Sequence, residues 1–590
     1  MTAQSSQSWL RALERTADIA RNPLVTLPVA VERLAAQFGE ADALVSRTDR
    51  LSYRALQERI AHYARWALAQ GLVPGDTVCL FKANCPEYPA IWLGISSIGG
   101  IVALLNTNLR GAALAHAIST VSPRHVIVGS ELHAAFSGAR NNLGPDIACW
   151  SHGGDGADMD RIDRDGAAPG APLDMAKRNP PNIRDTALYI YTSGTTGLPK
   201  AAAVSHFRLM QWSHWFAGMM DTGPGDRMYN CLPMYRSVGG VVAVGATLVG
   251  GGAVVVREKF SVREFWSDVA ESGCTLFQYV GEMCRYLARS PRGPHETDHR
   301  IRLCSGNGLS AGVWQEFQQR FRIPRILEFY ASTEGNVTLY NCEGKPGAIG
   351  RIPPFLAQRF AIELVKCDPE SGEPLRGDDG FCRRCEAGEI GHAIGRISDA
   401  AQTLGGRFEG YTDRAASQKK ILRDAFAKAD AWYLTGDLMT KDRSRYYYFV
   451  DRVGDTFRWK GENVSTAEVA DVLGACEGVV EAVVYGVRVP GAEGRAGMAA
   501  MVVDGGFDLS RFAQALSVKL ASYARPQFLR ICDAIDLTGT FKPQKERFKR
   551  QGFDLAAIRD PLYFWDRTLE TYVPLDAALH RRIQAGEVLL

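Results

Sequence analysis

One loop dominates this sequence: Thr192-Ser193-Gly194-Thr195-Thr196-Gly197-Leu198-Pro199-Lys200. It lies between two apolar runs, residues 187–191 and 201–204, which predict a strand on either side. Hydroxyl residues and glycines offer many O–H and N–H donors on a backbone that can approach a ligand closely, and Lys200 adds positive charge. This composition is unusual for an ordinary hairpin turn and suits a polyphosphate. The loop is not a P-loop, because Leu198 and Pro199 separate the second glycine from the lysine.

Helix and strand patterns alternate on the N-terminal side of this loop. Ser52 can cap a helix whose apolar face includes Leu56 and Ile60. Residues 77–81 and 101–105 are short apolar runs typical of buried strands. Such alternating units predict an α/β fold with layers of helices on a sheet.

The chain length calls for several modules. With 590 residues, and about 100 to 200 residues per domain, two to four modules are expected. After Gly454 the pattern restarts with a helix (466–473), a strand (481–487) and a second helix (509–520). We therefore expect a large multi-subdomain α/β body over residues 1–452 and a small α+β domain over residues 453–590.

Charge and composition exclude several classes of protein. Lys and Arg number 68 against 65 Asp and Glu, and no basic domain stands out, so a nucleic-acid partner is not expected. The 13 cysteines follow no repeating frame and the N-terminus has no leader pattern, which favours reduced thiols in the cytoplasm. Residues 238–256 carry no charge over 19 positions, but their glycines favour a buried helix and strand over a membrane span. Peripheral membrane association and the oligomeric state stay open.

The loop resembles the phosphate loop of the adenylate-forming superfamily, which includes acyl-CoA synthetases, luciferases and peptide-synthetase adenylation domains. Four further elements follow in the superfamily's order. They are an aromatic-Thr-Glu element (328–334), a ribose-binding turn (433–437), the start of the interdomain hinge (Asp451 and Arg452) and a C-terminal lysine loop (538–542).

Finer similarity points to one branch of that superfamily. Residues 451–465 and 306–309, and the Glu-Gly-Asn that follows Thr333, resemble the fatty-acid-transport-protein/very-long-chain acyl-CoA synthetase family. The resemblance implies that ATP and Mg²⁺ convert a long fatty acid to an acyl-adenylate, which then reacts with the co-substrate coenzyme A. It also implies that residues 1–452 bind AMP and the acyl chain and that residues 453–590 form a mobile cap.

The resemblance assigns roles to residues whose chemistry suits them. Joining two anions needs cations and hydrogen-bond donors where negative charge accumulates, and a carboxylate is a hard ligand for Mg²⁺. Phosphate binding is assigned to Thr192, Ser193, Gly194, Thr195, Thr196, Gly197 and Lys200; the metal to Glu334 and Thr192; the base and α-phosphate to Gly306, Asn307, Gly308, Tyr330, Ala331, Ser332 and Thr333; the ribose to Asp437 and Arg452. Lys460 and Gly461 are further ligand-binding candidates, Gly454 and Asp455 form the hinge, and Lys542 stabilises the adenylation transition state.

One position departs from the family pattern. The family usually has an aromatic-His pair near the acyl carboxylate, whereas this chain reads Leu232-Pro233-Met234-Tyr235-Arg236. Arginine stays charged and could clamp a carboxylate, obstruct the acyl tunnel or turn outward. We count Arg236 with Lys542, Glu334 and Thr192 as a catalytic candidate.

Several alternatives remain at the level of sequence. An acyl-AMP ligase that serves a carrier protein, or a ligase of other carboxylates with CoA, would share these motifs. A lipid-transport or lipid-binding component belongs to a different class. A degenerate, non-catalytic homologue is a third possibility, and the arginine at position 236 is the observation that favours it. Cys382 and Cys385 could form half of a zinc site, but no second pair lies at the required spacing.

Overall fold

The computed structural model describes residues 3–154, 159–164, 180–193, 199–368, 371–398, 407–460, 462–490, 492, 494–538 and 543–588. Contacts divide the chain into two compact units. Unit 1 contains Met1–Ala361 and Ile397–Ile421, and unit 2 contains Ile362–Arg396 and Leu422–Leu590. The expected limit between residues 452 and 453 therefore falls inside unit 2, and the division at that point stays a prediction.

Unit 1 contains a six-stranded sheet in the order β6-β5-β3-β4-β7-β8. All neighbours in it are parallel except the hairpin of β7 and β8. The strands are β3 (Thr77–Phe81), β4 (Ile101–Leu104), β5 (His125–Gly129), β6 (Ala148–His152), β7 (Thr186–Ser193) and β8 (Pro199–Ser205). Its helices include α3 (Tyr53–Ala69), α4 (Glu87–Ser97), α5 (Gly111–Ser119) and α6 (His133–Arg140). The predicted cap of α3 is confirmed, because the Ser52 hydroxyl accepts the Ala55 N–H at 3.1 Å.

A second sheet of unit 1 follows the order β2-β1-β10-β9-β11-β12-β13-β14-β15. Its strands are β1 (Asp42–Val45), β2 (Arg50–Ser52), β9 (Arg227–Asn230), β10 (Ala253–Val256), β11 (Leu276–Val280), β12 (Leu303–Asn307), β13 (Ile326–Ala331), β14 (Thr338–Asn341) and β15 (Gly350–Arg351). The strands from β1 to β13 in this order run parallel. Their carboxyl ends therefore share one edge, which is where open α/β sheets bind ligands.

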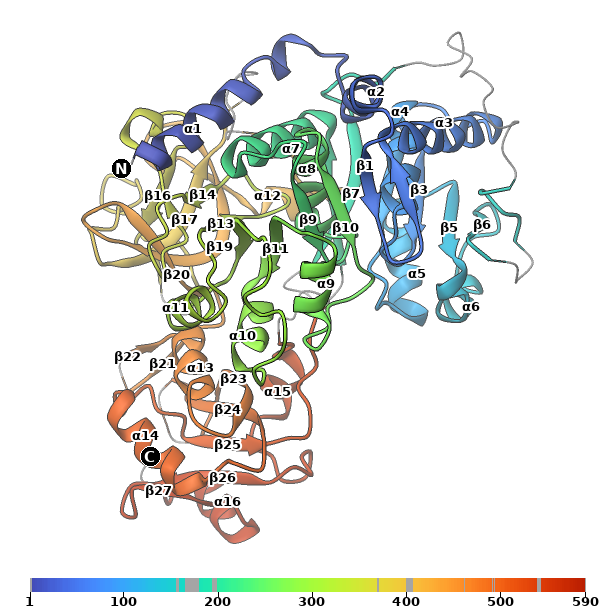
Figure 1. Cartoon of the computed structure of the whole chain (residues 1–590). Coiled ribbons are helices and arrows are strands. Elements are labelled where there is room, and N and C mark those ends of the chain that lie inside the picture. The colour runs from blue at the N-terminus through green and yellow to red at the C-terminus, as the bar shows by residue number, and fades with distance from the viewer. Residues whose placement is uncertain are drawn as a thin grey trace. The chain divides into compact units, whose positions relative to one another are not determined.

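The uncharged run 238–256 forms a π-helix (Val238–Val242), α8 (Ala243–Leu248) and the buried strand β10. The prediction of a buried helix followed by a parallel strand is confirmed. In Figure 1, α7 (His206–Met220) and α8 lie side by side, and α8 contacts β9 and β10. Among the described residues, no helix is both long enough and apolar enough to cross a bilayer.

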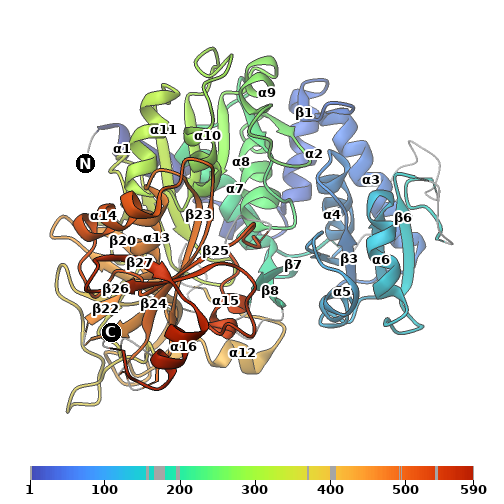
Figure 2. The ribbon, with the colours of Figure 1, turned by 90° about the horizontal axis from the view of Figure 1, so that it is seen from below.

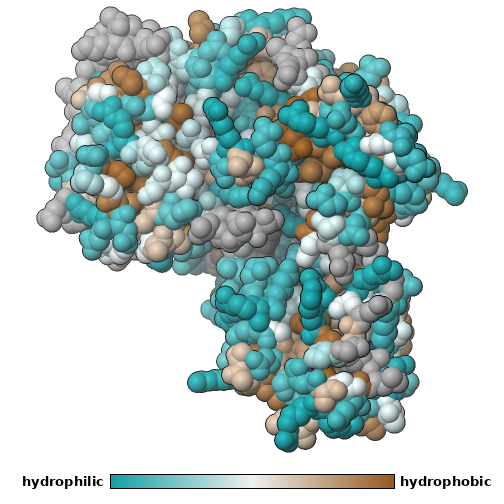
Figure 3. Space-filling view, turned by 180° about the vertical axis from the view of Figure 1, so that it is seen from behind, coloured by the Kyte–Doolittle hydropathy of each residue, from teal (hydrophilic) through white to brown (hydrophobic). Residues whose placement is uncertain are grey.

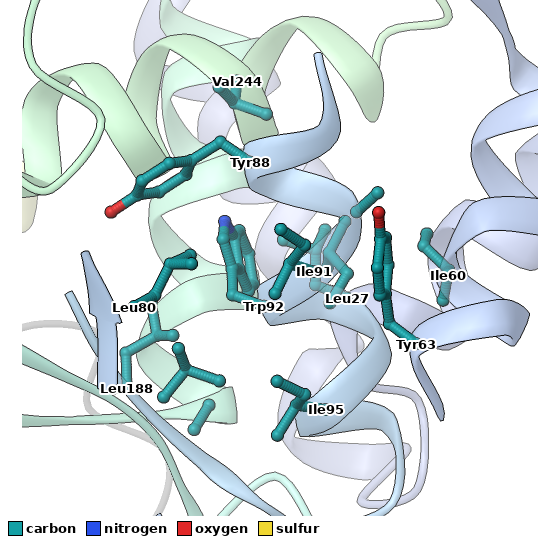
Figure 4. Packing of buried hydrophobic residues seen from close by; sticks show 14 of the residues in the cluster. Leu27, Ile60, Tyr63, Leu80, Tyr88, Ile91, Trp92, Ile95, Leu188 and Val244 are labelled. Carbon is teal, nitrogen blue, oxygen red and sulfur yellow. The ribbon is translucent and has the colours of Figure 1, made fainter. Parts of the chain in front are cut away.

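A large apolar core joins these layers of unit 1. Tyr88 and Trp92 of α4 are fully buried, and Figure 4 shows them beside Leu80 of β3 and Val244 of α8. The core thus connects the first sheet to the helix that follows the π-helix. Further helices of the unit are α1 (Ala3–Thr16), α2 (Leu27–Phe38), α9 (Phe265–Glu271), α10 (Gly281–Arg289), α11 (Ala311–Arg320) and α12 (Arg414–Gln418).

Unit 2 contains an antiparallel group of strands and a compact α+β part. The group is β16 (Ile362–Val365), β17 (Ile390–Arg396), β19 (Ala431–Lys441) and β20 (Tyr446–Arg452). A short hairpin of β21 (Phe457–Trp459) and β22 (Glu462–Val464) follows. The α+β part, which Figure 2 shows gathered around one sheet, comprises α13 (Thr466–Gly474), β23 (Val479–Val487), β24 (Ala496–Val503), α14 (Leu509–Lys519), β25 (Phe528–Ile531), α15 (Glu546–Gln551), β26 (Leu562–Asp566), β27 (Thr571–Pro574) and α16 (Ala577–Gln584).

These elements confirm the predicted fold class: α/β in the large N-terminal part and α+β at the C-terminus. Hydrophilic residues cover most of the face in Figure 3 and separate small hydrophobic groups. Scattered apolar side chains of this kind are normal on a protein surface.

Candidate active site

The predicted phosphate loop begins and ends on a β-hairpin. Thr192 of β7 and Lys200 of β8 are partners across the ladder, so the two ends of the loop meet. This confirms a loop between two strands. Gly194, Thr195, Thr196 and Gly197 lie outside the described residues, as does the side chain of Ser193, so their phosphate contacts stay a prediction.

A tyrosine joins Lys200 to Glu334. The Tyr411 hydroxyl donates to Oε1 of Glu334 at 2.7 Å, and the Lys200 ammonium lies 5.8 Å from the centre of the Tyr411 ring. Tyr411 is held there because its backbone forms a bridge with Ala202 of β8. The structure thus places Lys200 and Glu334 against one aromatic side chain that the sequence did not single out, and Thr192 is the ladder partner of that lysine.

Arg208 fixes the segments that carry Glu334 and Tyr411. This residue is 6% exposed, and its guanidinium donates to the carbonyl of Thr333 at 2.6 Å and to that of Arg407 at 2.8 Å. Nearby, the carboxylate of Glu409 accepts the N–H and the hydroxyl of Ser205 at 2.8 and 2.5 Å. These bonds tie the first turn of α7 to both segments. No motif indicated Arg208, because its partners lie far away in the chain.

The expected base-binding strip lies at the end of β12. Gly306 faces Glu328 across the ladder of β12 and β13, and a Cβ on Gly306 would stand 2.3 Å from the Tyr279 carbonyl. Gly308 has a φ of +81°, a conformation that glycine adopts without steric cost. Asn307 is the last residue of β12. Position 306 therefore requires glycine because the Tyr279 carbonyl lies too close for a Cβ, and position 308 favours glycine because of its positive φ.

Glu328 anchors that strip. Its carboxyl group accepts the N–H groups of Gly308 and Leu309 at 2.6 and 3.2 Å and the Tyr279 hydroxyl at 2.5 Å. Full burial raises the pKa of Glu328 to about 8, although these three donors favour the ionised form. The sequence placed Glu328 at the start of the aromatic-Thr-Glu element without assigning it this role.

The aromatic-Thr-Glu element continues from β13. Tyr330 and Ala331 end that strand, and Ser332, Thr333 and Glu334 follow it. The hydroxyls of Thr333 and Ser237 lie 3.1 Å apart and share a hydrogen bond. Because β12 and β13 are parallel neighbours, this element and the base-binding strip leave the sheet at the same edge. The structure brings these two predicted groups together.

Arg236 is half-buried and directed toward β7. Its Nη1 donates to the carbonyl of Tyr191 at 2.8 Å, while its Nε–H is buried without a hydrogen-bond partner among the described residues. Burial lowers the pKa of the guanidinium. The loop before it is fixed by Asn84, which accepts the Met234 N–H and donates to the Leu232 carbonyl, each at 2.8 Å. An outward orientation of Arg236 is not observed.

Unit 2 holds the expected ribose-binding pair. Asp437 and Arg452 are ladder partners on β19 and β20, and Nε of Arg452 lies 3.6 Å from Oδ1 of Asp437. The turn before Asp437 is fixed by His392, whose Nε2 accepts the Gly436 N–H at 3.0 Å. The Nδ1–H of His392 donates to the Gly372 carbonyl at 2.9 Å, which assigns one neutral tautomer. The structure brings the two residues together, and their role in binding ribose stays a prediction.

The expected hinge has a left-handed residue and a carboxylate with two lysine partners. Gly454 has a φ of +82° and open space around its Cβ position. Burial opposes ionisation of Asp455, but Lys545 and Lys549 outweigh it and lower the pKa of that carboxyl. Their ammonium groups lie 3.4 and 2.6 Å from Asp455. Neither lysine was predicted from the sequence.

A second carboxylate next to the hinge, that of Asp451, finds its hydrogen-bond partners in the same unit. Oδ2 of Asp451 accepts the N–H and hydroxyl of Thr466 at 2.6 and 2.7 Å, and Lys545 donates to that hydroxyl at 2.6 Å. Lys460, at the turn of β21 and β22, lies over the Trp459 ring at 5.7 Å, and burial lowers its pKa. Gly461 and Lys542 lie outside the described residues, so their roles stay predictions.

Known proteins resemble this chain over most of its length. A sequence model described as AMP-binding enzyme matches residues 31–390, and one described as AMP-binding enzyme C-terminal domain matches residues 468–542. Long-chain fatty acid transport protein 1 of Mus musculus is 43% identical over 527 residues, which cover 88% of this chain and 81% of that protein. Long-chain fatty acid transport protein 2 of Rattus norvegicus is 39% identical over 553 residues, which cover 92% and 87%.

Solved structures share the fold. A crystal structure of an anthranilate CoA ligase in complex with anthranoyl-AMP has a TM-score of 0.76 at 20% identity, covering 91% of this chain and 98% of that one. A benzoate CoA ligase from Burkholderia xenovorans has a TM-score of 0.74 at 20% identity, covering 89% and 100%. At this identity the likeness establishes the architecture, and the function has to be argued from the site.

Proposed function

The chain belongs to the AMP-binding enzyme family, in its fatty-acid-transport-protein/very-long-chain acyl-CoA synthetase branch, and from this premise we propose that it ligates long-chain or very-long-chain fatty acids to CoA. In the first step a carboxylate oxygen attacks the α-phosphorus of ATP, and pyrophosphate leaves. In the second step the CoA sulfur attacks the acyl carbon, its thiol proton is released, and AMP leaves.

The observation that carries this proposal is the cluster of Lys200, Tyr411 and Glu334. It joins the hairpin of the predicted phosphate loop to the residues that follow β13. A cation, a hydroxyl and a carboxylate gathered at the end of a glycine-rich loop suit a triphosphate and its metal ion. The names of the curated relatives support a long-chain fatty acid as the acyl substrate.

Glu334 fits the expected Mg²⁺ ion. One oxygen of its carboxylate accepts the Tyr411 hydroxyl, and the other has no partner among the described residues, so a hard ligand is free. Thr192 is the second candidate ligand on the hairpin. A bound Mg²⁺ would neutralise phosphate charge, while Lys200 and the loop backbone orient the β- and γ-phosphates.

We assign the second step to the residues around the hinge. Gly454 can absorb a large change in φ and ψ, so residues 453–590 can act as the mobile cap that the family resemblance implies. Asp437 and Arg452 would hold the ribose, and Lys542 would act in adenylate formation. Lys460 and Gly461 would contact ligand when the cap has moved.

Three assays separate this proposal from its alternatives. Purified protein is expected to catalyse ATP–pyrophosphate exchange that depends on a fatty acid, and then to form a thioester with free CoA. Exchange without the thioester would favour an acyl-AMP ligase that serves a carrier protein. Fatty-acid binding without exchange would favour a lipid-transport component or a degenerate homologue. Fractionation without detergent tests the proposed cytoplasmic location, and a protein confined to the membrane pellet would contradict it.

A further inference from the structure

The Arg236 guanidinium lies 5.6 Å from the centre of the Tyr235 ring but has no counter-ion among the residues that the structure describes. The described residues supply no carboxylate within ion-pair distance, and its recorded hydrogen bond goes to the neutral carbonyl of Tyr191. Its Nε–H is buried without a partner. A desolvated charge that stays unpaired is costly, so buried arginines are normally matched by an anion. Among the described residues, this guanidinium therefore has no anionic partner.

A second arginine, which follows a strand of the sheet whose strand β9 precedes Arg236, shows the usual arrangement. Arg257 follows β10, the strand next to β9, and its Nε and Nη2 atoms lie 2.9 and 3.2 Å from the two oxygens of Asp268. Its side chain is about as buried as Asp268, at 11% and 10% exposure. The contrast shows that this fold can supply a carboxylate to a buried arginine, whereas the described part of the chain supplies none at position 236.

The surroundings of Arg236 are apolar and tightly built. Met234 and Tyr235 are buried in the core that also contains Val241. The π-helix packs directly against this turn, since a Cβ on Gly240 would stand 1.9 Å from the Met234 carbonyl. π-helical turns are rare and occur frequently at functional sites. A cation at the border of such an apolar region suits an anion that carries an apolar chain better than it suits a hydrated polyphosphate.

The neighbours of Arg236 point to the reacting end of that anion. Its guanidinium is bonded to Tyr191, the residue before Thr192, and the next residue, Ser237, shares a hydrogen bond with Thr333. In the proposed function Thr333 contacts the α-phosphate. The cation therefore lies beside the place where a carboxylate would meet that phosphate, whereas Lys200 and Glu334 form a separate cluster with Tyr411.

We propose that Arg236 is the receptor for the carboxylate of the acyl substrate, and that its guanidinium acquires its counter-ion only when the acid binds. This inference rests on the proposed function and adds to it the group that recognises the acid. Arginine forms paired N–H···O bonds with a carboxylate and stays charged at every pH at which the enzyme would act. It thus fixes a negative headgroup and discriminates against a neutral one.

The test compares a fatty acid with the alcohol of the same chain length. Binding of dodecanoate and dodecanol to the full-length chain is measured by calorimetry, with ATP binding measured separately. Wild-type protein is expected to prefer the acid by at least about tenfold. Arg236→Met is expected to reduce that preference to about twofold and to leave ATP affinity unchanged, and Arg236→Lys is expected to restore part of it.

Thermal unfolding of the ligand-free proteins controls for a structural role. Arg236→Met is expected to be at least as stable as wild type, because it removes a charge that has no ion-pair partner among the described residues. Arg257→Met is expected to be less stable, because it removes two hydrogen bonds to Asp268 and leaves the more exposed Arg47 as the cation beside that carboxylate. Equal destabilisation by the two substitutions would show that Arg236 has a partner within the chain and would overturn the inference.

The remaining outcomes are also decisive. A loss of ATP affinity in Arg236→Met with the acid preference intact would assign Arg236 to the phosphates and overturn the inference. Equal binding of acid and alcohol by the wild type would overturn it as well, whether or not an adenylate forms. An acid preference that depends on Arg236, in a protein that exchanges no pyrophosphate, would support the inference and overturn the proposed function.

Discussion

Two carboxyl groups, one in each unit, anchor candidate site residues under opposite electrostatic conditions. Glu328 of unit 1 is fully buried among neutral donors, and its pKa rises to about 8. Asp455 of unit 2 lies between two lysines, and its pKa falls below the ordinary value. Buried hydrogen bonds from neutral donors favour a fixed structure, whereas ion pairs at a partly exposed site can break and re-form. The difference suggests a rigid binding surface in unit 1 and a rearranging segment in unit 2.

Glu334→Gln tests the first half of this comparison and is expected to have the largest effect. Loss of the carboxylate charge removes the candidate Mg²⁺ ligand, so fatty-acid-dependent pyrophosphate exchange should fall by about 10²–10³-fold. The rate of CoA thioester formation from supplied acyl-adenylate should change little. Glu316→Gln, which removes an exposed carboxylate of the same unit, is the control. Normal exchange in Glu334→Gln would show that Glu334 does not supply the metal ligand of the first step.

Gly454→Pro tests the second half and is expected to act on the opposite step. Proline fixes φ near −65°, so residue 454 could no longer undergo the backbone rotation that the proposed hinge requires for the second step. Thioester formation should fall about a hundredfold, and exchange should stay within a few-fold. Gly454→Ala should give a smaller loss in the same step. Gly505→Ala, at a glycine without positive φ and with open space, is the matched control. Survival of both steps in Gly454→Pro would place the hinge elsewhere.

Much of this arrangement could be predicted from the sequence, because it depends on local pattern and motif order. The cap of α3, the helix and strand of residues 238–256 and the adjacency of Asp437 and Arg452 belong to this group. Tyr411 could not be predicted, since it meets Glu334 across 77 residues through the pairing of its backbone with β8. The lysine partners of Asp455 lie 90 and 94 residues away, and nothing local marks them.

The dependence of thermal stability on pH in Glu328→Gln tests how the carboxyl of Glu328 differs from that of Asp455. The folded-state pKa of Glu328 is about 8, above the ordinary 4.5. The protonated carboxyl therefore makes its full contribution to the free energy of unfolding below pH 4.5, and this contribution is lost as pH rises to 8. The loss in wild type should amount to a few kcal/mol. The amide of the variant stays neutral and can donate to Tyr279, so its thermal midpoint should fall less between pH 5 and pH 8. Parallel pH curves for the two proteins would show that Glu328 does not titrate in this range.

Asp455→Asn is expected to have the smallest effect and the opposite dependence on pH. The folded-state pKa lies below the ordinary 3.8, so the ion pairs stabilise the protein above pH 3.8 and this contribution is lost as pH falls through the folded-state pKa. Replacing the carboxylate should lower the free energy of unfolding by about 1 kcal/mol at pH 7 and by little at pH 3. At pH 7, 1 M salt should make this loss of stability smaller. Asp533→Asn, at an exposed aspartate of the same unit, controls for the loss of one charge. If Asp455 were a fixed scaffold like Glu328, salt would leave the difference between Asp455→Asn and wild type unchanged. A cost that decreases with salt would instead support ion pairs that solvent ions can replace, as a rearranging hinge requires.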